Sequence, residues 1–107
     1  DIVYVKDLAK IFYLACKCDT TDGGMYNVGT GMPVTLLDQV KGMVEVFGEA
    51  DKKSQIVFCP DKPNARQYDI DIEKTRRDLG YEPSYSYIEY LEDFKKEMEM
   101  ERFKDLF

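Results

Sequence analysis

The stretch Tyr26-Asn27-Val28-Gly29-Thr30-Gly31, followed closely by Thr35-Leu36-Leu37-Asp38, decides the fold that this sequence predicts. The first stretch is a short apolar run that ends in a glycine turn. The second starts a helix, because a threonine three residues before an acidic residue is typical of a capping box. Strand, tight turn and helix in this order build ligand sites at strand ends in α/β proteins. We therefore predict an α/β fold with a functional turn at this point.

The glycine turn does not match a dinucleotide-binding fingerprint. That motif needs a third glycine three residues after Gly31, where the chain has Val34. Gly29 and Gly31 instead suit a turn that needs positive φ or a close approach of the backbone. Thr30 is best interpreted as a hydroxyl that stabilises the turn. The sequence therefore predicts that no cofactor pyrophosphate lies here.

Working outward from the turn, apolar spacing predicts short strands that alternate with helices. The alternation favours an α/β domain with some parallel strand pairing. We treat residues 1–107 as one domain. We expect Gly48 and Gly80 to end helices in the left-handed conformation, and Asp71 to cap one. The expected strands are 2–5, 25–28 and 54–59, and the expected helices run from Asp7 to Ala15, Thr35 to Phe47, Ile72 to Leu79 and Ser86 to Met98.

Composition excludes several classes of partner. The chain has 107 residues and a net charge of −6 without a long run of Lys or Arg, which argues against nucleic acid and an anionic membrane surface. An anionic small ligand needs only a few local cations and stays open. No apolar stretch of about 18 residues is present and the first residues lack a signal-peptide pattern, so we expect a soluble, cytoplasmic protein.

Two further features concern metals and chain length. The chain has no histidine and only three cysteines, Cys16, Cys18 and Cys59, so we predict no metal site and reduced thiols. The sequence opens on Asp1 and a β-branched run without an initiator methionine. We therefore expect the chain to be a fragment of a longer protein.

The strongest candidate for binding is the segment that follows Pro60. It carries Lys62 and Arg66 where the other loops are acidic or neutral. A guanidinium offers a planar, bidentate set of donors to phosphate oxygens, and an ammonium adds a point charge. The alternatives are an arginine and a lysine that only face solvent. Further along, Lys74 is expected to form an ion pair or to lie along its helix surface.

Three ordered segments carry a family resemblance that spans essentially the whole chain. They are Asp1-Ile2-Val3-Tyr4-Val5-Lys6-Asp7-Leu8-Ala9, then Tyr26 to Gly31, then Arg66-x-x-x-x-Asp71-x-x-Lys74 with Leu79-Gly80-Tyr81-x-Pro83. Together they resemble the C-terminal part of the extended short-chain dehydrogenase/reductase family, the NAD-dependent epimerases and dehydratases of nucleotide sugars. Two positions depart from it: Tyr4 stands where many members have histidine, and the loop 61–66 lacks the Arg-x-Gly-Asp start of many epimerases.

The resemblance implies a small, substrate-binding C-terminal lobe of a Rossmann-type enzyme. NAD and the catalytic residues would belong to an N-terminal Rossmann domain that this chain lacks, so the fragment itself would hold no cofactor and no catalytic residue. The parent would be most similar to a UDP-sugar 4-epimerase. In it, Arg66 would contact the diphosphate of a nucleotide-diphosphate sugar, Lys62 would add charge, and Tyr68 would face the substrate.

A different class of function stays open beside this one. The chain can be a freestanding module that binds a protein or a small ligand without catalysis, through its acidic surface and its amphipathic last helix. An isolated copy would then expose apolar faces and could self-associate.

Overall fold

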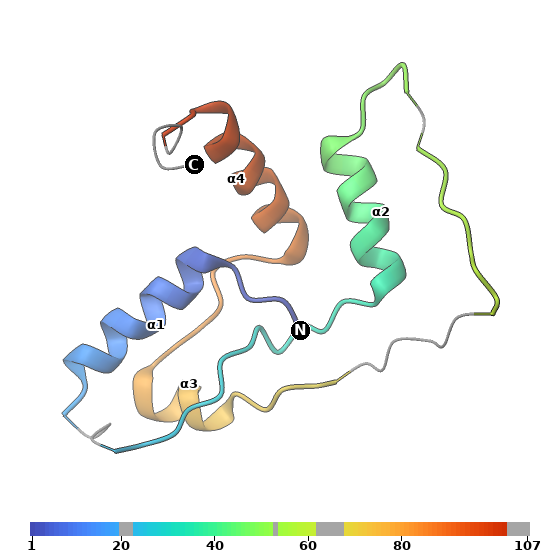
Figure 1. The fold of residues 1–107 in the computed structure, drawn as a ribbon. Coiled ribbons are helices and arrows are strands. Elements are labelled where there is room, and N and C mark those ends of the chain that lie inside the picture. Colours follow the sequence, from blue (N-terminus) through green and yellow to red (C-terminus); the bar gives the residue numbers. More distant parts are fainter. Residues whose placement is uncertain (20–22, 53, 62–67, 103–107) are drawn as a thin grey trace. The chain divides into compact units, whose positions relative to one another are not determined.

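The computed structural model describes residues 1–19, 23–52, 54–61 and 68–102. These residues form four α-helices, α1 (Val5–Lys17), α2 (Leu36–Phe47), α3 (Glu73–Leu79) and α4 (Tyr87–Glu99), shown in Figure 1. The one bridge between extended residues in this part of the chain is an isolated pair, Glu49 with Lys52. No described helix is both long and apolar enough to cross a membrane.

The contacts gather in two compact units. Unit 1 comprises Asp1–Val34 and Gln67–Ser86 and contains α1 and α3. Unit 2 comprises Thr35–Arg66 and Tyr87–Phe107 and contains α2 and α4. Each unit is therefore assembled from two segments that lie far apart in the sequence.

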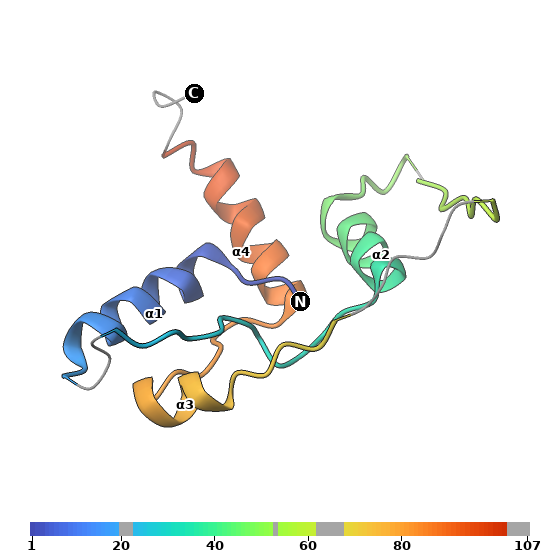
Figure 2. The same cartoon turned by 60° about the horizontal axis from the view of Figure 1, so that its bottom comes forward.

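The predicted α/β fold is wrong, because the described residues form helices and no strand. A strand needs the N–H and C=O groups of a neighbouring strand. In the expected strand 25–28, two carbonyls instead accept bonds from α3 side chains. The Lys74 ammonium donates to the Met25 carbonyl at 2.8 Å, and the Thr75 hydroxyl donates to the Asn27 carbonyl. In Figures 1 and 2 this segment accordingly runs beside α3.

The resemblance to the extended short-chain dehydrogenase/reductase family is corrected by the same finding. It implied a lobe of a Rossmann-type enzyme with short strands between its helices, whereas all regular structure in the described residues is helical. The short motifs that carried the resemblance are mostly caps and turns, which recur wherever a helix begins or ends. Their order along the chain therefore did not determine the fold.

The core of unit 1 is small and closely packed. Ile11 of α1 meets Ile72, Leu79 and Tyr81, and each of these four residues is less than a tenth exposed. Full burial of one such side chain contributes about 1.5 to 3 kcal/mol. The next residue of α1, Phe12, is 64% exposed.

Polar groups of α1 also hold the segment that follows α3. The Asp7 carboxylate is 1% exposed and accepts the Ser84 backbone N–H at 3.0 and 3.2 Å. The Lys10 ammonium donates to the Glu82 carbonyl and to the Ser84 hydroxyl. These bonds tie the segment after α3 to the first two turns of α1.

Unit 2 consists of α2 packed against α4. Gly42 allows the close approach, because a Cβ there would lie 2.9 Å from a Tyr87 ring carbon. Leu91 is 2% exposed, and the rings of Phe47 and Phe94 meet edge to face at a centroid distance of 6.4 Å. Phe94 nevertheless stays 43% exposed. Among the described residues, unit 2 therefore has fewer buried apolar side chains than unit 1.

The helix ends test the predictions made from local sequence. Thr35 caps α2 as predicted, since its hydroxyl accepts the Asp38 N–H at 3.1 Å. Gly80 ends α3 with φ of 63°, also as predicted. The left-handed cap predicted at Gly48 is wrong, because its φ is −65°. Gly48 still donates its N–H to the Val44 carbonyl at 2.9 Å, so α2 ends there without left-handed backbone.

Candidate functional site

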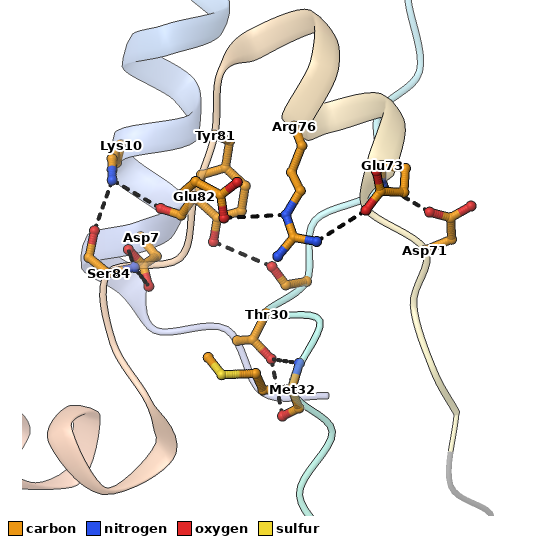
Figure 3. Close-up of polar contacts among 11 residues, drawn as sticks. Asp7, Lys10, Thr30, Met32, Asp71, Glu73, Arg76, Tyr81, Glu82 and Ser84 are labelled. Carbon is orange, nitrogen blue, oxygen red and sulfur yellow. Dashed lines mark hydrogen bonds and ion pairs between the residues drawn. The ribbon is translucent and has the colours of Figure 1, made fainter.

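A hollow of about 280 Å³ opens in unit 1 where the glycine turn meets the start of α3. It is lined by two residues of α3, by the segment that leads into that helix and by the glycine turn. The lining residues are Gly31, Asp69, Ile70, Asp71, Ile72, Glu73 and Arg76. Figure 3 shows the polar contacts around it.

The turn is held in place by Asp1 and by its own threonine. The Asp1 carboxylate accepts the backbone N–H of Thr30 at 2.9 Å and also the Thr30 hydroxyl. That hydroxyl in turn accepts the Met32 N–H at 3.1 Å. Thr30 is therefore a turn hydroxyl, as expected, and it fixes the backbone on both sides of Gly31.

The glycines have the two roles that the sequence predicted. Gly31 has a φ of +64°, a backbone region that residues with a side chain rarely adopt. Gly29 is a close approach, because a Cβ there would lie 2.6 Å from a carboxylate oxygen of Asp1. Both features bring the turn against Ile72 at the start of α3.

The predicted cap at Asp71 lies one residue before the N-cap of α3, which is Ile72, but its side chain still satisfies the first N–H of the helix. One of its carboxylate oxygens accepts the Glu73 N–H at 2.9 Å, and its carbonyl accepts the Asn27 side-chain amide at 3.1 Å. The Lys74 ammonium also lies 4.5 Å from the centre of the Tyr26 ring, a cation–π contact, so this side chain does not only lie along the helix surface. The approach to α3 is thus anchored to the segment before the turn.

Arg76 is the one cationic group in the lining, and two carboxylates orient it. Its Nη1 atom donates to Glu73 at 3.1 Å, and its Nε atom lies 3.3 Å from a Glu82 oxygen (Figure 3). The second contact is an ion pair without hydrogen-bond geometry. The hydrogen bond to Glu73 and the charge of Glu82 raise the pKa of Arg76 above its ordinary value. The guanidinium is therefore a fixed, fully charged donor.

The remaining edge of that guanidinium faces the glycine turn. A Cβ at Gly31 would lie 3.6 Å from Arg76 Nη2. A residue with a side chain at this position would occupy space over the guanidinium. The glycine therefore leaves room beside the donor.

Beside this cation the lining is acidic. Asp69, Asp71 and Glu73 set three carboxylates against the single guanidinium of Arg76, a net charge of −2. Within the described part of the chain, the Asp69 side chain makes no hydrogen bond or ion pair, and Asp71 uses one oxygen to accept the Glu73 N–H. The hollow thus offers several acceptors and one donor group. In the same part of the chain, no group of three or more His, Cys, Asp or Glu can hold a metal ion.

Of the three predicted site residues, one can be placed. Tyr68 is 66% exposed and directly precedes Asp69 of the lining. Lys62 and Arg66 lie outside the described residues. The structure therefore leaves their proposed contact with a diphosphate as a prediction.

Sequence reasoning missed the residues that line the hollow beside the cap, namely Asp69, Glu73 and Arg76. The spacing of Glu73 and Arg76 was a usable signal, because residues three apart on a helix are neighbours. The contacts of Arg76 with Glu82 and with the glycine turn had no such signal. They depend on how the chain folds back after α3.

Unit 2 contains a wider hollow of about 560 Å³ along α2 and α4. Its lining contains three acidic and two basic side chains and one valine: Glu45, Val46, Glu92, Lys95, Lys96 and Glu99. Lys95 already donates to the Val46 carbonyl at 2.7 Å. All of these residues belong to helix surfaces, where long charged side chains reach into water. We therefore take the hollow in unit 1 as the candidate site.

A comparison with known proteins gives a partial match. The chain is 35% identical over 71 residues to the low-salt glycan biosynthesis protein Agl12 of Haloferax volcanii. The match covers 65% of this chain but 22% of that protein, so the similarity concerns a small part of the relative. No family model matches the chain, and no solved structure does.

Proposed function

We propose that this chain contributes to glycan biosynthesis by holding a sugar-containing substrate. The observation that carries the proposal is the match of 71 residues to a protein named for glycan biosynthesis. The hollow beside Arg76 supports it, because carboxylates and a guanidinium are common hydrogen-bond partners of sugar hydroxyl groups.

The substrate that we propose is a nucleotide-diphosphate sugar. Arg66 would bind the diphosphate through paired donors, and Lys62 would add charge. Tyr68 would offer an exposed aromatic ring next to the hollow. Binding remote from the reacting atoms can be used to place a substrate correctly, so an anchoring role needs no catalytic group in this chain. NAD and a separate cofactor-binding domain stay predictions for a longer protein.

One observation favours the alternative of a protein-interaction module. The outer face of α1 exposes Val5 at 64%, Phe12 at 64% and Tyr13 at 58%. Large apolar side chains on one exposed face are typical of surfaces that contact another protein. This function would leave the hollow and Arg66 without a ligand.

The proposal is tested by titrating the chain with UDP-glucose, dTDP-glucose and GDP-mannose in ligand-observed NMR. Arg66→Ala is expected to weaken binding of the preferred nucleotide sugar by about 1.5 to 3 kcal/mol, because a charged hydrogen-bonding contact is lost. Arg102→Ala is the matched control, since this exposed arginine pairs with Glu97 at the other end of the chain. Equal affinities of the two variants would contradict the role of Arg66. Absence of binding by all three nucleotide sugars would contradict the proposed substrate.

A further inference from the structure

We infer that the hollow beside Arg76 is a subsite for one neutral sugar ring. The inference rests on the proposed function, since it names the part of the substrate that this site would take. It concerns different residues from the diphosphate anchor: Asp69, Asp71 and Arg76 in place of Lys62 and Arg66. The two assignments can therefore fail separately.

The size of the hollow limits what it can hold. Its volume of about 280 Å³ lies just below the range of small-molecule sites, which is about 300 to 1,000 Å³. A complete nucleotide sugar would need a site well above the lower end of this range. One ring of such a ligand fits the hollow, and the nucleotide would have to lie elsewhere.

The charges of the lining disfavour anionic ligands. A phosphate or carboxylate would meet the carboxylates of Asp69 and Asp71, and a guanidinium that is already paired with Glu73 and Glu82. In the described part of the chain, no acidic cluster is arranged to hold a metal ion either. A neutral, polar ligand avoids the repulsion.

The hydrogen-bonding groups match a polyol. Each sugar hydroxyl donates one hydrogen bond and accepts others, so adjacent hydroxyls need acceptors and donors together. Asp69 and the second oxygen of Asp71 supply acceptors, and the Nη2 edge of Arg76 supplies donors. Ile70 and Ile72 line the same hollow and offer apolar surface to the C–H groups of a ring.

The site, apart from the exposed Asp69 side chain, is also held in place before a ligand binds. Asp1 and Thr30 fix the turn, Asp71 is tied to the start of α3, and Arg76 is held between Glu73 and Glu82. Groups that are already ordered lose little conformational entropy when a ligand arrives. A rigid set of donors and acceptors can therefore select a ring by the directions of its hydroxyls.

The test compares each nucleotide sugar with its bare nucleoside diphosphate: UDP-glucose with UDP, dTDP-glucose with dTDP, and GDP-mannose with GDP. Affinities are measured by NMR titration of the full chain, and saturation-transfer difference spectra show which ligand protons contact the protein. Asp69→Ala removes an exposed acceptor and leaves the caps intact. Asp51→Ala is the control, because Asp51 is exposed in unit 2 and lies outside the hollow.

Asp69→Ala is expected to weaken the bound nucleotide sugar about tenfold, the loss of one charged hydrogen bond, and to leave the bare diphosphate unchanged. Saturation of the sugar-ring protons should fall with it. If the nucleotide sugar binds but is insensitive to Asp69→Ala, the sugar subsite is overturned and the proposed function stands. If neither nucleotide sugars nor diphosphates bind, both proposals are overturned.

Discussion

Unit 1 and unit 2 are held together in different ways. In unit 1, side chains from distant parts of the sequence hydrogen-bond to backbone groups, as Asp7 does to Ser84 and Thr75 to Asn27, around a buried Tyr81. In unit 2, two helices approach at Gly42 and leave Phe47 and Phe94 partly exposed. Unit 1 therefore has a closed core with a polar hollow at its edge, and unit 2 has a half-covered pair of helices.

This difference indicates that unit 1 can position a ligand more firmly than unit 2. Ligand groups are placed well only by side chains whose own positions are fixed. The polar cross-links of unit 1 fix Gly31 and Arg76, whereas the charged side chains along α2 and α4 mostly extend into water. The proposed sugar subsite accordingly belongs to the unit with the closed core.

The largest expected effect comes from emptying the core of unit 1. Tyr81→Ala removes a side chain that is 0% exposed and should lower the free energy of unfolding by about 3 to 5 kcal/mol, the usual cost of truncating a buried aromatic. Phe94→Ala in unit 2 should cost about 1 kcal/mol, because that ring is 43% exposed and only part of its transfer free energy is lost. Amide hydrogen exchange measures both units separately. Equal losses of unfolding free energy in the two variants would contradict the proposed difference between the two units.

A smaller effect is expected at high pH, again from Tyr81. Burial, and then the charge of Asp7, raise the pKa of Tyr81 from 10.0 to about 12. The neutral phenol is thus favoured in the folded state, so its contribution is fully present below pH 10 and is lost as the pH rises through 12. Two pKa units correspond to roughly 2 to 3 kcal/mol at most.

Urea unfolding of the wild type and of Tyr81→Phe, followed by circular dichroism across this pH range, measures the effect. The phenylalanine variant cannot ionise and keeps the ring, so its stability should fall less between pH 10 and 12. Its own cost should be small, because the bond from the Tyr81 hydroxyl to the Gly29 carbonyl is long at 3.4 Å. If the unfolding free energies of the two proteins change with pH in the same way, the pKa of Tyr81 is the same in the folded and the unfolded state, and the prediction is wrong.

The smallest expected effect concerns the packing of α2 against α4 at Gly42. Gly42→Leu inserts a side chain where a Cβ would already lie 2.9 Å from the Tyr87 ring and 3.0 Å from Ile88. Overpacking costs about 1 to 3 kcal/mol, and the better helix propensity of leucine offsets about 1 of this. We expect a net loss of about 1 kcal/mol in chemical denaturation. The exposed position Lys41 provides the control, Lys41→Leu, which should stay within about 0.5 kcal/mol.

Local signals predicted the helices well. Thr35, Asp71 and Gly80 mark helix ends in the structure as their residue types indicated, because a cap is satisfied by atoms within a few residues. The strand predictions were wrong because a strand depends on residues that are distant along the chain. A β-branched or apolar run only becomes a strand when another strand pairs with it, and residues 25–28 found α3 instead.

The candidate site shows the same division. The sequence singled out the glycine turn and Asp71, and both lie at the hollow. It did not indicate Arg76, whose orientation depends on Glu82 beyond the end of α3 and on the space over Gly31. Lys62 and Arg66 were chosen for their charge and for the family resemblance, and both lie outside the described residues.

By itself, the sequence determined the net charge, the positions of the helices and the conformation of the turn at Gly31. Each of these depends on the residue itself or on neighbours within one helical turn. Only the tertiary structure decided that the extended segments stay unpaired, that Arg76 is held between two carboxylates, and that Asp69 and Gly31 share one hollow. These features require contacts between residues that are distant along the chain, and no local pattern specifies which distant groups will meet.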